Sequence, residues 1–376
     1  VLGLVISKKL LETFPDDKEG VLDKKLASLV NRKKCCQISK IFRLENYILT
    51  DTVKSKKNKI EDKIISDACE ALIGAIYLDQ GFSAAEKALT LDKNLAEGYK
   101  ALAHLYAVIG NDTESLRNNL KAVKLKPNFS SAIANVGLRY RGKGDLSESL
   151  DWYTKARKIN PNNRVGTTQF AFAHALLGEE EMAEKIFLDG ITNDKYAFQL
   201  YWGLIRHYLT NGKYNKAKYY VDEVTSLMSD DERYNDLASA FYLYTKDYKQ
   251  ALIHSNKINN PNDNQKLRTA FLNYKLGRNF DLQSLKQRSL KVINDGGNYY
   301  QTNPYLILSQ IFAIENKKLE SYKWFDEAIN DGFSNYKVLM TNPMFENIKG
   351  NDDYFSLINK MKDHIDRERI EAGLES

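Results

Sequence analysis

The chain has 376 residues, a formal net charge of +6 and three cysteines, and these totals exclude several classes of protein. The cysteines are too few for a disulfide framework, and no His or Cys cluster has zinc-ligand spacing. No run of 18 apolar residues and no signal peptide is present, so we expect a cytoplasmic protein without a membrane span. Only 20 Gly and 6 Pro occur, and so few helix breakers favour an all-α fold.

Two stretches dominate the first 87 residues. The first, FPDDKEGVLDKKLASLVNRK, spans residues 14–33, and the second, IEDKIISDACEALIGAIYLDQGF, spans residues 60–82. With the spacing between them, they resemble the second conserved stretch and the last catalytic helix of ribonuclease III endonuclease domains. We therefore expect residues 1–87 to form a helical domain of this family.

The resemblance implies Mg²⁺-assisted hydrolysis of double-stranded RNA, with the metal held by carboxylates. Asp67 and Glu70 match the family's two carboxylates on this helix, and their i, i+3 spacing places both on one helical face. Glu19 matches the acidic residue before the family's glycine, here Gly20. The candidate catalytic residues are Glu19, Asp67 and Glu70, with Asp67 and Glu70 as metal ligands. Taken alone, D-x-x-E before an apolar run is equally typical of a helix capping box.

The start of the chain bears on activity. The resemblance places the family's signature stretch, similar to E-R-L-E-F-L-G-D, immediately before Val1, and Val1 opens directly on an apolar helical run. That signature supplies the other metal carboxylates, and the repeats begin where the family commonly has a double-stranded-RNA-binding domain. We therefore expect the domain to be incomplete at its N-terminus and inactive in this chain.

A lysine-rich segment precedes the second stretch. Lys54, Lys56, Lys57 and Lys59 lie within six residues of one another and are candidates for contact with RNA phosphates. A solvated loop explains the same charges and is the commoner case.

Residues 96–190 repeat with a period of 34. Gly110, Gly144 and Gly178 are 34 residues apart, and small residues recur in register around them. Such columns are typical of antiparallel helix pairs that cross closely at small residues, with a glycine turn between the helices. The period and its columns resemble the tetratricopeptide family, which implies an α-solenoid of helical hairpins.

The pattern continues less regularly. Gly212 marks a fourth unit, Lys246 replaces the turn glycine of a fifth, and the sixth, at Gly277, is poorly formed after Phe280. Residues around Phe312 and Phe325 recover a seventh. We expect a solenoid of about six or seven units over residues 88–335, followed by a helical cap and tail at residues 336–376 that keeps the end of the array polar.

The first helix of each tetratricopeptide unit lines a concave groove in this family. Matching columns places six residues near that lining, where an extended peptide or partner helix could be held by basic and aromatic side chains. These partner-groove candidates are Lys100, His104, Asn135, Arg139, Trp202 and Arg206. Any single one of them is also explained as an ordinary solvated helix residue.

Three hypotheses for the whole chain remain open. The leading one is a protein- or peptide-binding scaffold that carries a remnant ribonuclease III domain. The second is an Mg²⁺-dependent double-stranded-RNA endoribonuclease whose repeats recruit a partner. The third is an artefactual chimera of two genes, since the half-unit ALTLDKN at residues 88–94 begins where the first family's resemblance ends.

Overall fold

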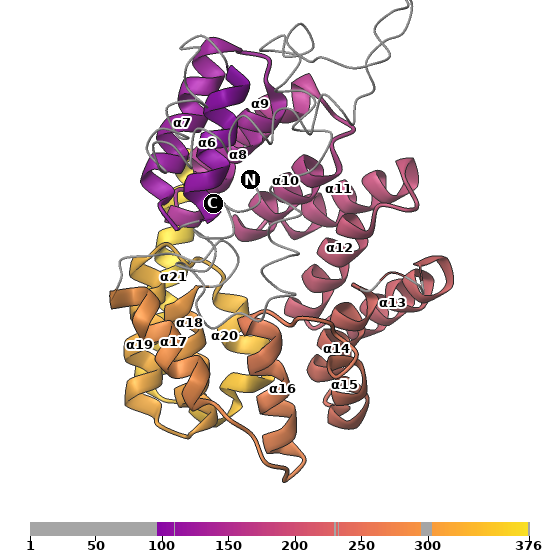
Figure 1. Cartoon of the computed structure of the whole chain (residues 1–376), viewed down its shortest axis with the longest axis vertical. Helices are drawn as coiled ribbons and strands as arrows, with labels where there is room; N and C mark the ends of the chain where they lie inside the picture. Colours follow the sequence, from indigo (N-terminus) through magenta and orange to yellow (C-terminus); the bar gives the residue numbers. More distant parts are fainter. Residues whose placement is uncertain (1–95, 109, 229–230, 232, 295–302, 375–376) are drawn as a thin grey trace, which may run out of the picture. The chain divides into compact units, whose positions relative to one another are not determined.

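The computed structural model describes residues 96–108, 110–228, 231, 233–294 and 303–374. Within these ranges all regular structure is helical and no strand occurs (Figure 1). The predicted all-α fold class is confirmed for this part of the chain. None of its helices is long and apolar enough to cross a membrane.

Backbone contacts divide the chain into two compact units, Val1–Leu102 and Ala103–Ser376. The division falls inside the first described helix, α6 (Ala96–Val108), and from α7 onward every described helix belongs to the second unit. The domain boundaries expected after residues 87 and 335 stay predictions.

The helices after α6 follow one another at short intervals. They are α7 (Asp112–Leu125), α8 (Ser130–Lys143), α9 (Leu146–Ile159), α10 (Arg164–Leu176), α11 (Glu180–Asn193), α12 (Phe198–Thr210), α13 (Tyr214–Met228), α14 (Tyr234–Tyr244), α15 (Tyr248–Ser255), α16 (Asp263–Lys275), α17 (Gln283–Asn294), α18 (Pro304–Ile314) and α19 (Lys318–Asn330). From α8 to α15, and again at α18 and α19, consecutive helices pack as hairpins. The exception is α17, which packs on α18 rather than on α16, and this fits the poor sixth unit expected from the sequence.

A residue in the left-handed backbone conformation ends the first helix of each regular hairpin. Gly144, Gly178 and Gly212 have φ values between +69° and +88°. At the next 34-residue step the residue is Lys246, and its φ is +62° even though this region costs a side-chain-bearing residue about 1 kcal/mol. The 34-residue spacing therefore predicts the backbone geometry of the turn even where glycine is missing.

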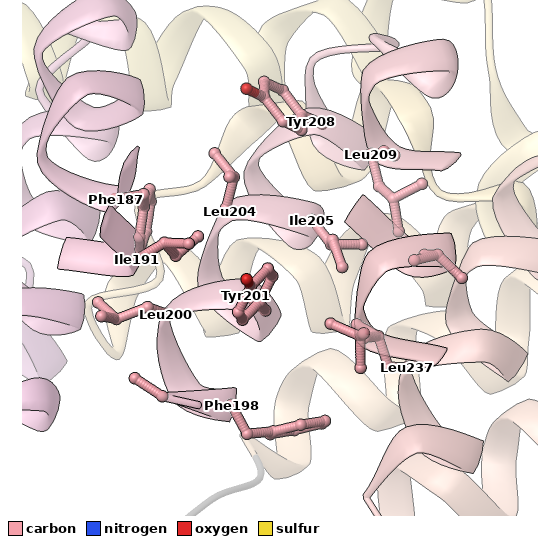
Figure 2. Packing of buried hydrophobic residues seen from close by; sticks show 14 of the residues in the cluster. Phe187, Ile191, Phe198, Leu200, Tyr201, Leu204, Ile205, Tyr208, Leu209 and Leu237 are labelled. Carbon is pink, nitrogen blue, oxygen red and sulfur yellow. The ribbon is translucent and has the colours of Figure 1, made fainter. Parts of the chain in front are cut away.

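The largest core cluster surrounds α12, which contacts α10, α11, α13 and α14 (Figure 2). Because neighbours cover it on several sides, most of its side chains are buried, including Tyr201, Leu204 and Tyr208. At Gly203 the approach of α11 is so close that a Cβ would lie 2.4 Å from Cε1 of Phe187. The small residue at this position is therefore a requirement of helix packing.

The C-terminal cap follows α19 and consists of α20 (Tyr336–Thr341), the 3₁₀ helix η2 (Pro343–Ile348) and α21 (Asp352–Glu371). Along its length α21 contacts α19, α20 and α9. Ile365 packs with Leu146, Leu150 and Tyr153 of α9. The end of the chain thus returns to an early hairpin of the array.

We expect Gly203→Ala to lower the free energy of unfolding by about 1–3 kcal/mol. The added Cβ meets the Phe187 ring, which is fully buried in a packed core. Urea unfolding followed by circular dichroism at 222 nm measures the change.

The matched control is Gly142→Ala on α8, where a Cβ would meet nothing within 4 Å. Alanine loses less conformational entropy than glycine, so this variant should gain about 0.5–1 kcal/mol. Equal urea midpoints for the two variants would contradict the packing argument.

Candidate functional site

The predicted catalytic residues lie outside the described part of the chain. This holds for Glu19, Asp67 and Glu70, and for the lysines predicted to contact RNA, Lys54, Lys56, Lys57 and Lys59. Among the described residues, no group of three or more His, Cys, Asp and Glu side chains is placed to hold a metal ion. The site that the structure does describe is a cavity in the second unit.

The cavity has a volume of about 470 Å³ and is lined by residues of the array and of the segment that follows α19. First helices of three successive hairpins border it on one side, and the segment between α19 and α20 borders it on the other. Its aromatic and charged lining residues are Asp112, Arg139, Arg141, Phe172, Glu180, Trp202, Arg206, His207, Asp331, Phe333 and Lys337. The cavity therefore combines aromatic faces with side chains of both charges.

Trp202 and Arg206 lie one turn apart on α12 and act as a pair. The Arg206 guanidinium lies 4.7 Å from the centre of the Trp202 ring, and Phe172 of α10 meets that ring edge-on at 5.9 Å. The Arg206 side chain is exposed, while Trp202 is half-buried. Stacking restricts the guanidinium without consuming its hydrogen-bond donors, so these donors stay available to a ligand.

Arg139 borders the cavity from α8 and is tied to its neighbour helix. Its guanidinium forms an ion pair with Asp112 in the first turn of α7, and its side chain is only 9% exposed. Asn135, one turn earlier, donates through Nδ2 to Asn119 Oδ1 at 3.4 Å. Arg139 is therefore held in place at the wall, whereas the Asn135 amide is engaged between helices.

Lys100 and His104, the remaining groove candidates, lie one turn apart on α6, where both are half-buried. Of the six candidates, Arg139, Trp202 and Arg206 meet at the one cavity. That any of the six binds a partner stays a prediction.

A polar network links the array to the cap at the other wall of the cavity. Asn211 Nδ2 donates to Glu180 Oε2 at 2.8 Å, and Lys337 Nζ donates to Asn211 Oδ1 at 2.8 Å. Lys337 also forms an ion pair with Glu180. The buried ring of His207 lies beneath, with Nε2 3.4 Å from Glu180 Oε2.

The pKa of His207 is lowered to about 4, mainly by burial. The ammonium groups of Lys213 and Lys216 also lower this pKa, and together they outweigh the Glu184 carboxylate, which raises it. The imidazole is therefore neutral near pH 7. Burial alone would raise the pKa of Glu184, but hydrogen bonds from Lys216, Tyr208 and Lys213 outweigh it and hold that pKa at about 2. Near pH 7 the His207 ring is therefore neutral and the Glu184 carboxylate is ionised.

Column matching missed Arg141, Glu180, Asn211 and Lys337. Glu180 opens a second helix and Asn211 stands in a turn, so neither occupies the column that was matched. Lys337 lies outside the repeat, and no local pattern indicates that the cap returns to α12. Arg141 lies in the last turn of α8, and weighing charged residues at helix ends would have found it.

Comparison with known proteins identifies the front of the chain. Residues 1–81 match the family model of the ribonuclease III domain. The N-terminal region is a ribonuclease III domain. Its curated relatives include Ribonuclease 3 of Pelagibacter ubique, 49% identical over 141 residues, which are 38% of this chain and 61% of that protein. Ribonuclease 3 of Rhodopseudomonas palustris is 43% identical over 86 residues, 23% of this chain and 32% of that protein. The chain thus spans about three fifths or less of the length of these relatives.

Solved structures similar to the chain include a tetratricopeptide repeat protein from Parabacteroides merdae, with a TM-score of 0.40 and 16% identity over 72% of this chain and 98% of that one. Another is YrrB, described as having an unusual peptide-binding site, with a TM-score of 0.33 and 19% identity over 46% of this chain and 89% of that one. The tetratricopeptide character of the array rests on its own hairpins and their 34-residue spacing.

We expect the array to lose stability as the pH falls from 7 to 4. The unfolded chain binds a proton at His207 with an ordinary pKa of 6.5, whereas the folded chain resists it down to about 4. The difference amounts to at most about 3 kcal/mol, present above pH 6.5 and lost as the pH falls. Glu184 adds a further loss between pH 4.5 and 2. Urea midpoints between pH 4 and 7 measure the effect.

His207→Gln should flatten this dependence, because the neutral amide cannot be protonated. The control is His254→Gln, since His254 is only half-buried and its lowered pKa comes from weaker desolvation and Lys257. An unchanged slope in His207→Gln would show that the pH dependence originates elsewhere.

Proposed function

We propose that the chain is a cytoplasmic protein- or peptide-binding scaffold. Its helical array holds the partner, and its ribonuclease III domain is a remnant without catalytic activity. The observation that supports this best is the convergence of Arg139, Trp202 and Arg206 on one cavity. Tryptophan and arginine are the residues that most often contribute strongly to binding energy at protein interfaces.

The chemistry of the cavity suits a peptide. The Arg206 fork, already stacked on Trp202, offers planar donors to backbone carbonyls or to a carboxylate. Phe172 and Trp202 offer apolar faces, and Glu180, which pairs with Lys337, would accept a basic side chain in place of that lysine. A peptide binds here at reduced entropic cost because most of these side chains are held by neighbours before it arrives.

A second candidate is an Mg²⁺-dependent double-stranded-RNA endoribonuclease whose array recruits a partner. The ribonuclease III match over residues 1–81 favours it. In that case Asp67 and Glu70 would hold Mg²⁺, Glu19 would belong to the catalytic set, and the lysines between residues 54 and 59 would contact RNA. Bound Mg²⁺ would supply charge neutralisation at the phosphate and activation of water.

Peptide binding is tested with a phage-displayed library of random 12-residue peptides selected on the full chain. The Kd of selected peptides is then measured by fluorescence polarisation. Arg206→Ala should weaken binding tenfold or more, about 1.4 kcal/mol, because it removes the exposed donors of the cavity.

Lys155→Ala is the matched control, since Lys155 lies 4.6 Å over the ring of Trp152 in a similar pair on α9 that does not border the cavity. Equal losses in both variants, or no selected peptide, would refute groove binding.

The two candidates differ in their response to double-stranded RNA. If the scaffold proposal holds, the purified chain with Mg²⁺ leaves a labelled RNA duplex intact. If the chain is an endoribonuclease, cleavage occurs, Asp67→Asn abolishes it, and Arg206→Ala leaves it unchanged. Gel electrophoresis of the labelled duplex distinguishes these outcomes.

A further inference from the structure

The segment between α19 and α20 lies in backbone contact with the array. A Cβ at Gly332 would lie 2.4 Å from the carbonyl carbon of Lys143 and 2.5 Å from the carbonyl oxygen of Gly142. Gly332 also has φ +100°, where a side chain is strained. No other residue fits this point without moving the cap away from α8.

Polar contacts hold the segment at its first residue and, just after its end, in the first turn of α20. Asn303 Nδ2 donates to Asp331 Oδ2 at 3.2 Å, and Lys337 pairs with Glu180 and donates to Asn211. Residues 331–335 with Lys337 and Val338 border the cavity that Trp202 and Arg206 also line. A turn, three residues without regular structure and the first turn of α20 thus line the cavity in which a peptide would lie.

Three contacts from α21 hold this arrangement closed. His364 Nε2 donates to the carbonyl oxygen of Gly144 at 2.8 Å, and Arg369 donates to that of Leu177. Glu368 Oε2 accepts from the backbone N–H of Ser147 at 2.8 Å. All three partners are helix-end groups that water can satisfy when the cap is away. Each hydrogen bond exchanged for water changes the free energy only modestly.

Apolar contacts join the segment to α19 and to the cap. Phe333 packs edge-on against Phe325 at 5.7 Å, and Leu339 is buried in the same cluster. Phe325 belongs to α19, so this packing joins the segment and the cap to the last hairpin of the array. The cap also makes an apolar contact with α9, where Ile365 packs with Leu146 and Tyr153. Moving the cap would therefore also break the contact of Ile365 with α9, while the Lys337 ammonium, on its flexible stem, can leave Glu180 first.

We propose that residues Asp331–Val338 close the groove as a built-in competitor, and that the ligand displacing them is an extended peptide with a Lys or Arg side chain for Glu180. This rests on the proposed function, because it takes the ligand of the groove to be a peptide. Charge complementarity specifies the basic side chain, since Glu180 is the carboxylate that Lys337 now neutralises.

Closure itself is tested without a ligand. The full chain has three tryptophans, so Trp152→Phe with Trp324→Phe leaves Trp202 as the reporter on the cavity wall. In this background Gly332→Ala should raise the acrylamide quenching constant of Trp202 at least twofold by pushing the cap off α8. The control is Gly350→Ala, which has a similar φ of +92° and nothing within 4 Å of its Cβ. Equal quenching in the two variants would overturn closure by this segment.

The ligand chemistry is tested with a synthetic peptide of residues 329–341, INDGFSNYKVLMT, and the same peptide carrying Lys337→Glu. The native peptide should bind the Gly332→Ala chain at least tenfold more tightly than the unaltered chain, and the Glu peptide should not bind. In the chain itself, Lys337→Ala should also increase peptide binding, whereas Lys249→Ala, an exposed lysine of α15, should not.

The quenching and peptide-binding experiments distinguish failure of closure from failure of the peptide ligand. Raised quenching in Gly332→Ala with neither peptide bound would refute the peptide ligand and the proposed function, while leaving closure by the cap intact. Equal binding of both peptides would overturn the role of Glu180. Circular dichroism at 222 nm confirms that each variant is folded, and Lys337→Ala provides an opened chain should Gly332→Ala fail to fold.

Discussion

The structure depends on how closely two helices approach where the sequence has a small residue. At Gly203 the Phe187 ring occupies the space of a Cβ, and at Gly137 the Tyr153 ring lies 3.1 Å from that point. A hairpin in a solenoid cannot bury its apolar face alone, so these approaches determine how the next hairpin stacks. Stacking in turn aligns α8, α10 and α12 along one cavity. The cavity and its charged residues follow from this packing constraint.

Much of the fold could be read from the sequence because solenoid contacts are local. The 34-residue spacing located the turns, and it extended to Lys246, whose φ is positive although lysine has no intrinsic preference for that region. It also indicated the irregular sixth unit, where α17 packs on α18. The return of α21 to α9 was not predictable, because it pairs residues such as Gly144 and His364 that are 220 positions apart. No local periodicity encodes a contact of that range.

The site was predictable to the extent that it lies on repeated columns. Arg139, Trp202 and Arg206 occupy such columns and meet at the cavity, whereas Asn135 is drawn into a hydrogen bond with Asn119. Lys337 and Asn211 were missed because one belongs to the cap and the other to a turn. In the ribonuclease III domain, by contrast, the candidate residues come from the sequence alone. A sequence motif predicts Asp67 and Glu70 as metal ligands, and both lie outside the described residues.

The long-range contact between α21 and α9 also affects synthesis. During translation the hairpin of α8 and α9 leaves the ribosome long before its last partner exists, since His364 follows Gly144 by 220 residues. At the usual elongation rates this delay is on the order of 10–40 s. Throughout that interval Leu146, Leu150 and Tyr153 lack the cover of Ile365. The apolar surface of a nascent early hairpin is thus available to chaperones until the final helix arrives, so the order of synthesis and the order of burial differ in this chain.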